Sequence, residues 1–280
     1  FYYSHRLKLH FWDWGDNGKP NLILVHGSRD HARSWDRIAN AFCTDFRVVA
    51  PDLRGHGDSS WAPGAMYSIP EYVLDVSALV DIVDRFPVYL IGHSLGAAIV
   101  LQYAGVYPDR VAKLVAIDGF GPLPEKLVPR PAHQRLRQWI ETMRSYEQRQ
   151  SRRYPSIQAA VSRMQQANPY LTEEMARHLT LFGSNWSPDG SLSWKFDNYV
   201  RAFSPYGFNM EDAQEIWGQI TCPTLLVRGM ESWSVDPEKD GRIRAIANYR
   251  LLHIPRAGHW AHHDQPQTFI DETRRFFREG

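Results

Sequence analysis

The sequence is poor in cysteine, in net charge and in long hydrophobic runs. Its two cysteines, Cys43 and Cys222, form no C-x-x-C pair, and no cluster of histidine and cysteine has zinc-ligand spacing. Because the two cysteines lie in separate apolar segments, we expect two reduced, buried thiols rather than a disulfide. The net charge of +1 at pH 7 gives no general attraction to nucleic acid or to a membrane surface, so we expect neither as a partner.

Internal repeats, low-complexity tracts and membrane-spanning runs are also missing, and no segment resembles a signal peptide. The 280 residues, of which 43% are hydrophobic, are enough for one large domain with an insertion. The first residue is Phe1 rather than Met, which leaves open whether a preceding segment was removed. We expect a cytoplasmic protein and leave its oligomeric state open.

What the sequence does contain is a serine flanked by glycines. The motif GHSLG, Gly92–Gly96, follows the apolar run 88–91, typical of a buried strand, and precedes 97–104, rich in helix formers. G-x-S-x-G between a strand and a helix is a nucleophile elbow, in which a sharp turn exposes the serine hydroxyl at the end of a sheet. The plain alternative is a glycine turn with a capping serine, which the flanking strand and helix argue against. Ser94 is therefore the candidate nucleophile.

A serine hydroxyl needs a base to become a nucleophile at neutral pH. His259 lies in a loop after the predicted strand 249–254 and before a predicted helix that covers 269–277. A loop histidine at the carboxyl end of a strand can reach Ser94, so His259 is the candidate base. His262 and His263 have no such positional argument, and we expect them at the start of a helix or on the surface.

Two further motifs occur in order along the chain: LILVHGS at 22–28 and PDLRGHGDS at 51–59. With the serine and histidine motifs, they make the chain resemble the α/β-hydrolase superfamily over nearly its whole length, in its capped form with a serine nucleophile. The resemblance implies an eight-stranded, mostly parallel sheet with helices on both faces and a helical cap inserted after the sixth strand. We expect the core in residues 1–118 and 209–280 and the cap in 119–208.

The hydrophobic pattern independently favours the α/β class. Residues 6–11 alternate and predict an amphipathic edge strand, whereas 46–50 and 111–117 are continuous apolar runs that fit strands buried on both faces of a parallel sheet. The motif S-x-x-E at 68–71 predicts a helix capping box, and an apolar stripe over 73–83 continues that helix.

By the resemblance, the oxyanion hole consists of two backbone N–H groups, those of Ser28 and Leu95. Such donors stabilise the oxyanion of a tetrahedral intermediate. The chain departs from the common H-G-x-x-G form because Arg29 and Asp30 follow Ser28. The shape of the acyl pocket is therefore not predicted. The glycines and charges of 54–57 are interpreted as ordering a loop without taking part in chemistry.

Three carboxylates are candidates for the acid of a catalytic triad. In most members of the superfamily it follows the seventh strand, but the position three residues after Gly229 is Ser232. Glu231 comes one residue earlier, and Asp236 comes four residues later. Some relatives carry the acid after the sixth strand, where this chain has Asp118. We favour Asp118, with Glu231 as the alternative and Asp236 as a third candidate, because the acid needs only to reach the histidine.

The amino-acid composition changes after Gly119. Residues 125–153 contain eight Lys or Arg and three Glu, a basic stretch that we interpret as a solvated surface. One helical face carries Leu136, Trp139, Ile140, Met143 and Tyr146. Seven aromatic residues follow, which would either cover the catalytic serine or attach the cap to the core: Trp186, Trp194, Phe196, Tyr199, Phe203, Tyr206 and Phe208. We expect Trp139, Met143 and Trp260 to line the substrate pocket.

Together these features predict a serine hydrolase that cleaves a small, partly apolar carboxylic ester through an acyl-enzyme, without metal or organic cofactor. Carbon–carbon bond hydrolysis of ring-fission products, lactone hydrolysis and thioester hydrolysis use the same residues and stay open. A different class of protein, a ligand-binding sensor on a hydrolase scaffold, also stays open. Ser94 occupies the position at which dehalogenases and epoxide hydrolases carry an aspartate, which argues against both activities.

Overall fold

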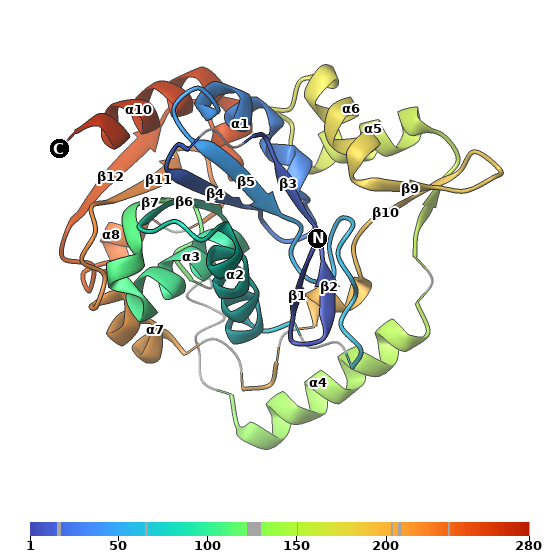
Figure 1. Cartoon of the computed structure of the whole chain (residues 1–280). Coiled ribbons are helices and arrows are strands. Elements are labelled where there is room, and N and C mark those ends of the chain that lie inside the picture. Colours follow the sequence, from blue (N-terminus) through green and yellow to red (C-terminus); the bar gives the residue numbers. More distant parts are fainter. Residues whose placement is uncertain are drawn as a thin grey trace.

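The computed structural model describes residues 1–279 except 16–17, 65–66, 122–129, 150, 203, 207–208 and 235. Its centre is a twisted sheet with helices on both faces (Figure 1). In the described residues this sheet has seven strands in the order β12-β11-β7-β6-β4-β5-β3, parallel except for β3. The strands are β3 (Phe11–Asp13), β4 (Asn21–Val25), β5 (Arg47–Pro51), β6 (Val88–His93), β7 (Val111–Ile117), β11 (Thr224–Gly229) and β12 (Tyr249–Ile254). The predicted class, a mostly parallel sheet covered on both faces, is confirmed.

The count of eight strands is not met in the described residues, because the predicted edge strand 6–11 is divided. Strands β1 (Tyr2–Ser4) and β2 (Leu7–Leu9) form a separate antiparallel pair, and β3 begins after His10. The His10 N–H donates to Ser59 Oγ at 2.8 Å, and the His10 carbonyl accepts from the Asp52 N–H at 2.9 Å. The backbone of His10 therefore bonds to a neighbouring loop, which separates β2 from β3.

Helices cover the two faces of the sheet because every central strand is apolar on both sides. Along β4, Ile23 and Val25 pack toward α2, α3 and α7, whereas Leu22 and Leu24 pack toward α1 and α10. Successive side chains of a strand point to opposite faces, so a continuous apolar run requires a covered sheet. The core helices are α1 (Asp36–Phe42), α2 (Ile69–Val83), α3 (Leu95–Val106), α7 (Met210–Trp217), α8 (Pro237–Asp240), α9 (Ala261–Asp264) and α10 (Pro266–Arg278), with 3₁₀ turns η1 (Ala32–Trp35) and η2 (Pro108–Arg110).

Helix α2 begins as the capping box predicts. The Ser68 N–H donates to Glu71 Oε2 at 2.9 Å, and Pro70 lies in the first turn, where its missing N–H costs no hydrogen bond. The apolar stripe faces the core, with Val76, Leu79, Val80 and Val83 buried.

The chain leaves the sheet after β7, the strand predicted at 111–117 and the fifth of the seven in chain order. The inserted segment contains α4 (Ala132–Glu147), β8 (Arg153–Tyr154), α5 (Ile157–Ala167), α6 (Glu173–Phe182), β9 (Ser184–Trp186), β10 (Leu192–Trp194) and the 3₁₀ turn η4 (Asn198–Arg201). It is not purely helical, because β8, β10 and β9 form a small antiparallel sheet. The boundaries of a cap at 119 and 208 stay a prediction.

The elements of the inserted segment differ in how they meet the core. In Figure 1, α5 and α6 lie beside β3, whereas α4 projects from the bottom of the molecule. Phe196 and Tyr199 pack against the core, as the attaching role requires. Trp186 and Tyr206 are 54% and 75% exposed, so neither attaches the segment to the core. Phe203 and Phe208 are outside the described residues.

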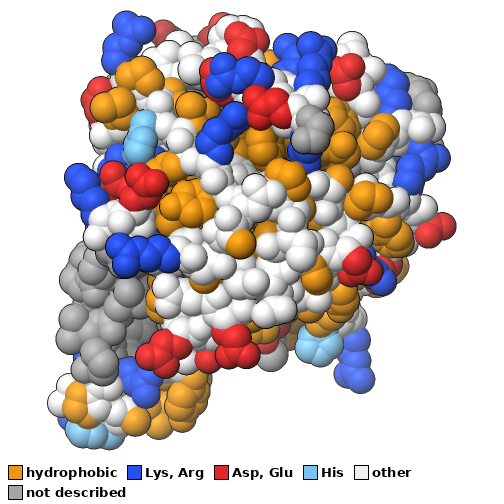
Figure 2. Space-filling view, turned by 90° about the vertical axis from the view of Figure 1, so that its left-hand side faces the viewer, with side chains coloured by type: hydrophobic (Ala, Val, Ile, Leu, Met, Phe, Trp, Pro, Cys, Tyr) orange, Lys and Arg blue, Asp and Glu red, His pale blue; other side chains and the backbone are white. Residues whose placement is uncertain are grey.

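The remaining surface features are ordinary. Acidic and basic side chains are interleaved on the face in Figure 2, and its apolar side chains are scattered among polar atoms.

Cys222 is buried and Cys43 is only half-buried, and both are free thiols, so the expectation of two buried thiols holds for one of them. Among the described helices, none combines the length and the apolar character that a membrane crossing requires.

Candidate active site

Ser94 lies at the sharp turn between β6 and α3. Its backbone has φ 53° and ψ −113°, a conformation that residues other than glycine rarely adopt. The turn is compact because of its two glycines: a Cβ at Gly92 would overlap the Gly96 carbonyl, and a Cβ at Gly96 would overlap the Val25 carbonyl. The Ser94 N–H donates to the Ile117 carbonyl at 2.8 Å, which holds the turn against the end of β7.

A chain of hydrogen bonds joins Ser94 to a histidine and an aspartate. His259 Nε2 lies 2.9 Å from Ser94 Oγ, and His259 Nδ1 lies 2.6 Å from Asp118 Oδ2. The three residues follow β6, β12 and β7 and so meet at the carboxyl edge of the parallel sheet, where open α/β sheets bind ligands. Asp118 and His259 are 3% and 6% exposed, whereas Ser94 is half-buried. The arrangement shields the hydrogen bond between His259 and Asp118 and leaves the serine hydroxyl accessible.

The other two candidate acids have different partners. Glu231 is exposed and accepts a hydrogen bond from the Tyr170 hydroxyl. Asp236 caps α8, where its Oδ1 accepts from the Glu238 N–H at 3.2 Å. Within the described part of the chain, neither of them bonds to His259, and Asp118 does.

Sequence reasoning missed two serines that hold Asp118. The hydroxyl of Ser232 donates to Asp118 Oδ2, and the hydroxyl of Ser234 donates to Asp118 Oδ1. These donors satisfy a buried carboxylate and fix its orientation toward His259. The signal was present in the sequence, because Ser232 occupies the position at which most members of the superfamily carry the acid. The loop after β11 therefore contacts the candidate acid, Asp118, through these two hydroxyls.

The two predicted oxyanion donors lie on either side of Ser94. Leu95 is the first residue of α3, and Ser28 begins a tight turn in which the Asp30 N–H donates to the Gly27 carbonyl at 3.4 Å. A Cβ placed on Gly27 would come within 3.3 Å of Ser94 Cβ, so this turn lies directly against the serine. In the residues that the structure describes, no protein group accepts from the N–H of Ser28 or Leu95.

Three aromatic rings surround His259. His93 Nε2 donates to the His259 carbonyl across 3.0 Å, Trp260 lies edge-on with ring centroids 5.1 Å apart, and Trp233 covers the ring at 4.5 Å. Trp233 is 63% exposed despite its apolar surface. The sequence motifs give no indication of a role for His93 or Trp233. Both restrict the orientation of the imidazole.

Residues 20–266 match the sequence family described as the alpha/beta hydrolase fold. The chain belongs to this family. The match covers both the strand that carries Ser94 and the loop that carries His259.

Several proteins similar to this chain have the names of hydrolases. "Serine hydrolase-like protein" of Danio rerio is 28% identical over 218 residues, which cover 76% of this chain and 66% of that protein. Epoxide hydrolase 4 of Mus musculus is 27% identical over 277 residues (93% and 73% of the two chains), and Esterase Rv0045c of Mycobacterium tuberculosis is 26% identical over 266 residues (93% and 83%). The solved thioesterase domain from the curacin biosynthetic pathway has a TM-score of 0.83 at 24% identity and covers 97% of this chain and 96% of its own. That likeness shows the fold.

The predicted pocket residues of this α/β hydrolase lie in two places. Trp139 and Met143 line a cavity of about 230 Å³ between α4 and η4, together with Tyr199. Trp260 lies against His259 and is not part of that lining. Their common role in a substrate pocket stays a prediction.

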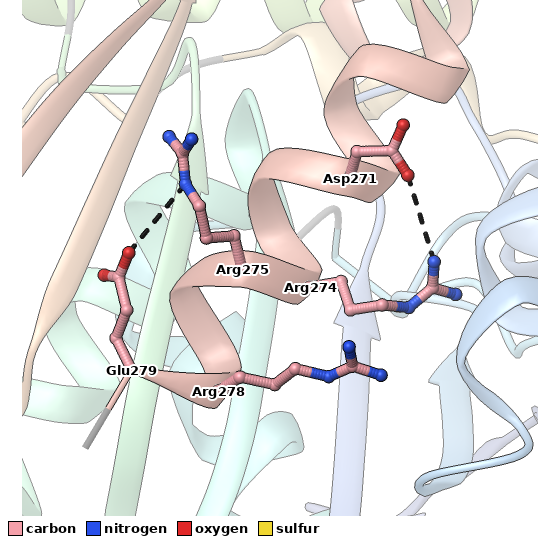
Figure 3. A pocket seen from close by; sticks show the side chains of 5 residues that line it. All are labelled: Asp271, Arg274, Arg275, Arg278 and Glu279. Carbon is pink, nitrogen blue, oxygen red and sulfur yellow. Dashed lines mark ion pairs between the residues drawn. The ribbon is translucent and has the colours of Figure 1, made fainter.

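A larger cavity, about 370 Å³, opens on α10 (Figure 3). Its charges largely pair with one another, since Arg274 lies 3.9 Å from Asp271 and Arg275 lies 3.8 Å from Glu279. None of its lining residues belongs to the hydrogen-bond chain of Ser94.

One group in the described chain has the geometry of a metal site. Ligand atoms of His10, Asp52 and Asp58 lie within 4.8 Å of one another. These atoms already have protein partners, because Asp52 Oδ1 accepts from the Ala32 N–H at 2.7 Å and Asp58 Oδ1 lies 2.7 Å from Lys195 Nζ. The group is explained by loop structure, and the expectation of no metal cofactor stays a prediction.

Five buried histidines of the described chain have a pKa below the usual value. Burial, together with neighbouring histidines, lowers the pKa of His26 and His263 to about 3, and burial lowers that of His56 to about 4. Burial and neighbouring imidazoles also hold the pKa of His93 and His262 well below its usual value. His262 and His263 were expected at the start of a helix or on the surface. Both lie in the short helix α9, which agrees with the first alternative, and both are buried.

These histidines make acid pH destabilising. An unfolded chain protonates them below a pH of about 6.5, whereas the folded protein keeps them neutral. The unfolded state then binds more protons, so the free energy of unfolding falls as the pH drops below that value. Above it, this contribution is fully present.

His262→Phe tests this effect. Both ring nitrogens of His262 lack a hydrogen-bond partner among the described residues, and its ring stacks on Trp35 at 4.6 Å, so phenylalanine fits the site. We expect the variant to be more stable than wild type by about 2 kcal/mol at pH 5 relative to the difference at pH 8. Urea unfolding at both pH values measures it, with His133→Phe on the exposed α4 as control. Parallel pH curves for wild type and His262→Phe would contradict the explanation.

Proposed function

We propose that this α/β hydrolase is a serine hydrolase that cleaves a small, partly apolar carboxylic ester through an acyl-enzyme. The observation that carries the proposal is the hydrogen-bond chain from Ser94 through His259 to Asp118, with distances of 2.9 and 2.6 Å. Its order and contacts are those of a nucleophile, a base and an orienting acid.

The geometry supports a two-step reaction. Ser94 Oγ attacks the ester carbonyl while His259 Nε2 takes its proton, and His259 then returns the proton to the leaving alcohol. Water attacks the acyl-enzyme with His259 again as base, which restores the serine. The N–H groups of Ser28 and Leu95 stabilise the oxyanion in both steps. Asp118 holds the imidazole in the tautomer with Nδ1–H and stabilises the imidazolium.

The names of the relatives divide among serine hydrolase, epoxide hydrolase and esterase. Ser94 favours the first and the last, because an alkoxide attacks an acyl carbon, and epoxide opening by a covalent route uses a carboxylate at this position. Thioesters, lactones and carbon–carbon bonds beside a carbonyl are alternative electrophiles for the same three residues.

A substrate panel separates these reactions. We expect turnover of p-nitrophenyl esters with an optimum at short acyl chains, measured beside a thioester, a lactone and a vinylogous diketone. Hydrolysis of the diketone without ester turnover would replace the proposal with carbon–carbon bond hydrolysis. A single slow turnover on every substrate would favour a ligand-binding sensor.

A further inference from the structure

A carboxylate closes the loop that carries His259. Asp264, the last residue of α9, is half-buried, and its Oδ2 accepts from the Gly258 N–H at 2.8 Å. Its own N–H donates to the Trp260 carbonyl at 2.9 Å. Because Gly258 and Trp260 are the two neighbours of His259 in the chain, these bonds fix the backbone immediately before and after the base.

The same carboxylate bonds to the inserted segment. Asp264 Oδ1 accepts from Asn168 Nδ2 at 3.0 Å, and Asn168 follows α5, 96 residues earlier in the chain. Burial raises the pKa of the Asp264 carboxyl, and the hydrogen bonds from Asn168 and Gly258 counter this rise because they favour the charged form. One oxygen of Asp264 therefore bonds to the inserted segment, and the other bonds to the loop of the base.

Asn168 is fixed in one orientation. It is 4% exposed, and its N–H donates to the Met164 carbonyl at 3.1 Å, at the end of α5. Its Oδ1 accepts from the Tyr170 N–H at 3.1 Å, which leaves its Nδ2 to donate to Asp264. The Tyr170 ring lies against the same loop, because a Cβ on Gly258 would come within 3.6 Å of it.

The neighbouring backbone groups of this loop are held by the core. The Ala257 carbonyl accepts from the Glu231 N–H at 2.9 Å, and the His259 carbonyl accepts from His93 Nε2 at 3.0 Å. The Gly258 N–H lies between these two groups in the chain, and its acceptor is the carboxylate that the inserted segment orients. The position of the base therefore depends on the insertion as well as on the sheet.

We propose that Asp264 and Asn168 act as a positioning pair, through which the inserted segment holds His259 in line with Ser94. The base has to meet two partners at once, because its Nε2 lies 2.9 Å from Ser94 Oγ and its Nδ1 lies 2.6 Å from Asp118 Oδ2. A displacement of about 1 Å in such a group can cost about 100-fold in rate. The inference rests on the proposed function, and it gives the inserted segment a part in aligning the proposed triad.

Exchanging the two side chains tests the pair. Asp264→Asn alone brings two amide N–H₂ groups face to face, and Asn168→Asp alone brings two carboxylates together, so each variant loses the bond between the segments. In the double variant the amide at position 264 donates to the carboxylate at position 168 and still accepts from the Gly258 N–H. The carboxylate at position 168 still accepts from the Tyr170 N–H, so all three hydrogen bonds are restored with nearly unchanged shapes.

We expect Asp264→Asn and Asn168→Asp each to lower kcat for ester hydrolysis by about tenfold with little change in KM, and the double variant to return to within about threefold of wild type. The loss falls on kcat because the base is displaced while the groups that bind the ester are kept. Active-site titration gives kcat per competent molecule, and urea unfolding measures stability separately. Asp271→Asn makes the same change on the exposed side of α10 and should leave kcat unchanged.

A pair with a structural role alone would lower the free energy of unfolding when it is broken and would leave kcat per active site unaltered. That result would overturn the proposal. A double variant as slow as the single variants would also overturn it, because the loss would then not come from the bond between the two side chains.

Labelling of Ser94 by a serine-directed phosphonate separates this inference from the choice of substrate, because the reaction needs the base but no ester. We expect the rate constant of labelling to fall about tenfold in each single variant and to recover in the double variant, even where no ester of the panel is hydrolysed. Equal rates in wild type and all three variants would overturn the positioning role and leave the proposed serine hydrolase in place. Absence of labelling in wild type would contradict the proposed function itself, and this inference with it.

Discussion

Ser94→Ala is expected to lower kcat for ester hydrolysis by about 10³-fold or more while the protein stays folded. The variant removes the only atom that forms the acyl-enzyme, and the oxyanion donors that remain supply a small residual rate. The free energy of unfolding should change little, because Ser94 is half-buried and its hydroxyl bonds to His259 rather than to the core. Steady-state kinetics with a chromogenic ester and urea unfolding give the two quantities.

Covalent labelling provides an independent check of the same residue. A serine-directed phosphonate should add to wild type at Ser94, as peptide mass spectrometry reports, and should leave Ser94→Ala unmodified. An adduct on a different serine, or full turnover by the variant, would remove Ser94 from the mechanism. Ser232 and Ser234 serve as internal controls, because their hydroxyls donate to Asp118 whereas Ser94 Oγ bonds to His259 Nε2, and we expect no adduct on either.

Asp118→Asn is expected to lower kcat by about 10⁴-fold, by analogy with the aspartate of a serine protease triad. The amide is nearly isosteric, so the fold is kept, but it presents an N–H₂ group where His259 Nδ1–H needs an acceptor. The imidazole then turns to the tautomer whose Nε2 carries a proton and cannot accept one from Ser94. Kinetics on the ester used for Ser94→Ala measures the loss.

The competing carboxylates provide matched controls. Glu231→Gln and Asp236→Asn make the same chemical change in the neighbouring loop, and we expect each to alter kcat by less than about tenfold because Tyr170 and α8 hold these side chains. A loss in Glu231→Gln as large as that in Asp118→Asn would assign the acid to the loop after β11. Near-normal activity of Asp118→Asn would contradict the proposed catalytic triad.

Local sequence was sufficient for the features that neighbouring residues impose. The turn at Ser94 needs glycine on both sides, so the motif Gly92–Gly96 marks it directly. The capping box at Ser68 and Glu71 and the apolar run of β4 also reflect constraints within a few residues. Patterns of this kind predicted the α/β class and the positions of several of its strands.

These local patterns could not predict contacts between segments that are far apart in the sequence. The edge strand predicted at 6–11 is divided because His10 bonds to a loop more than forty residues away. His262 and His263 turn inward because α9 packs on Trp35, which no local pattern shows. The small sheet of β8, β9 and β10 pairs short segments whose sequences carry too few residues for a recognisable alternation.

The sequence by itself determined the class of the fold, the strained turn that exposes Ser94 and the loop that supplies His259, because each depends on residues adjacent in the chain. Only the tertiary structure decided which of three carboxylates meets His259 and that His262 and His263 are buried. These outcomes depend on where parallel strands end relative to one another and on how α9 packs against Trp35. Asp118 lies 141 residues before His259 in the chain and 2.6 Å from it in space, and packing of the sheet alone brings the two together.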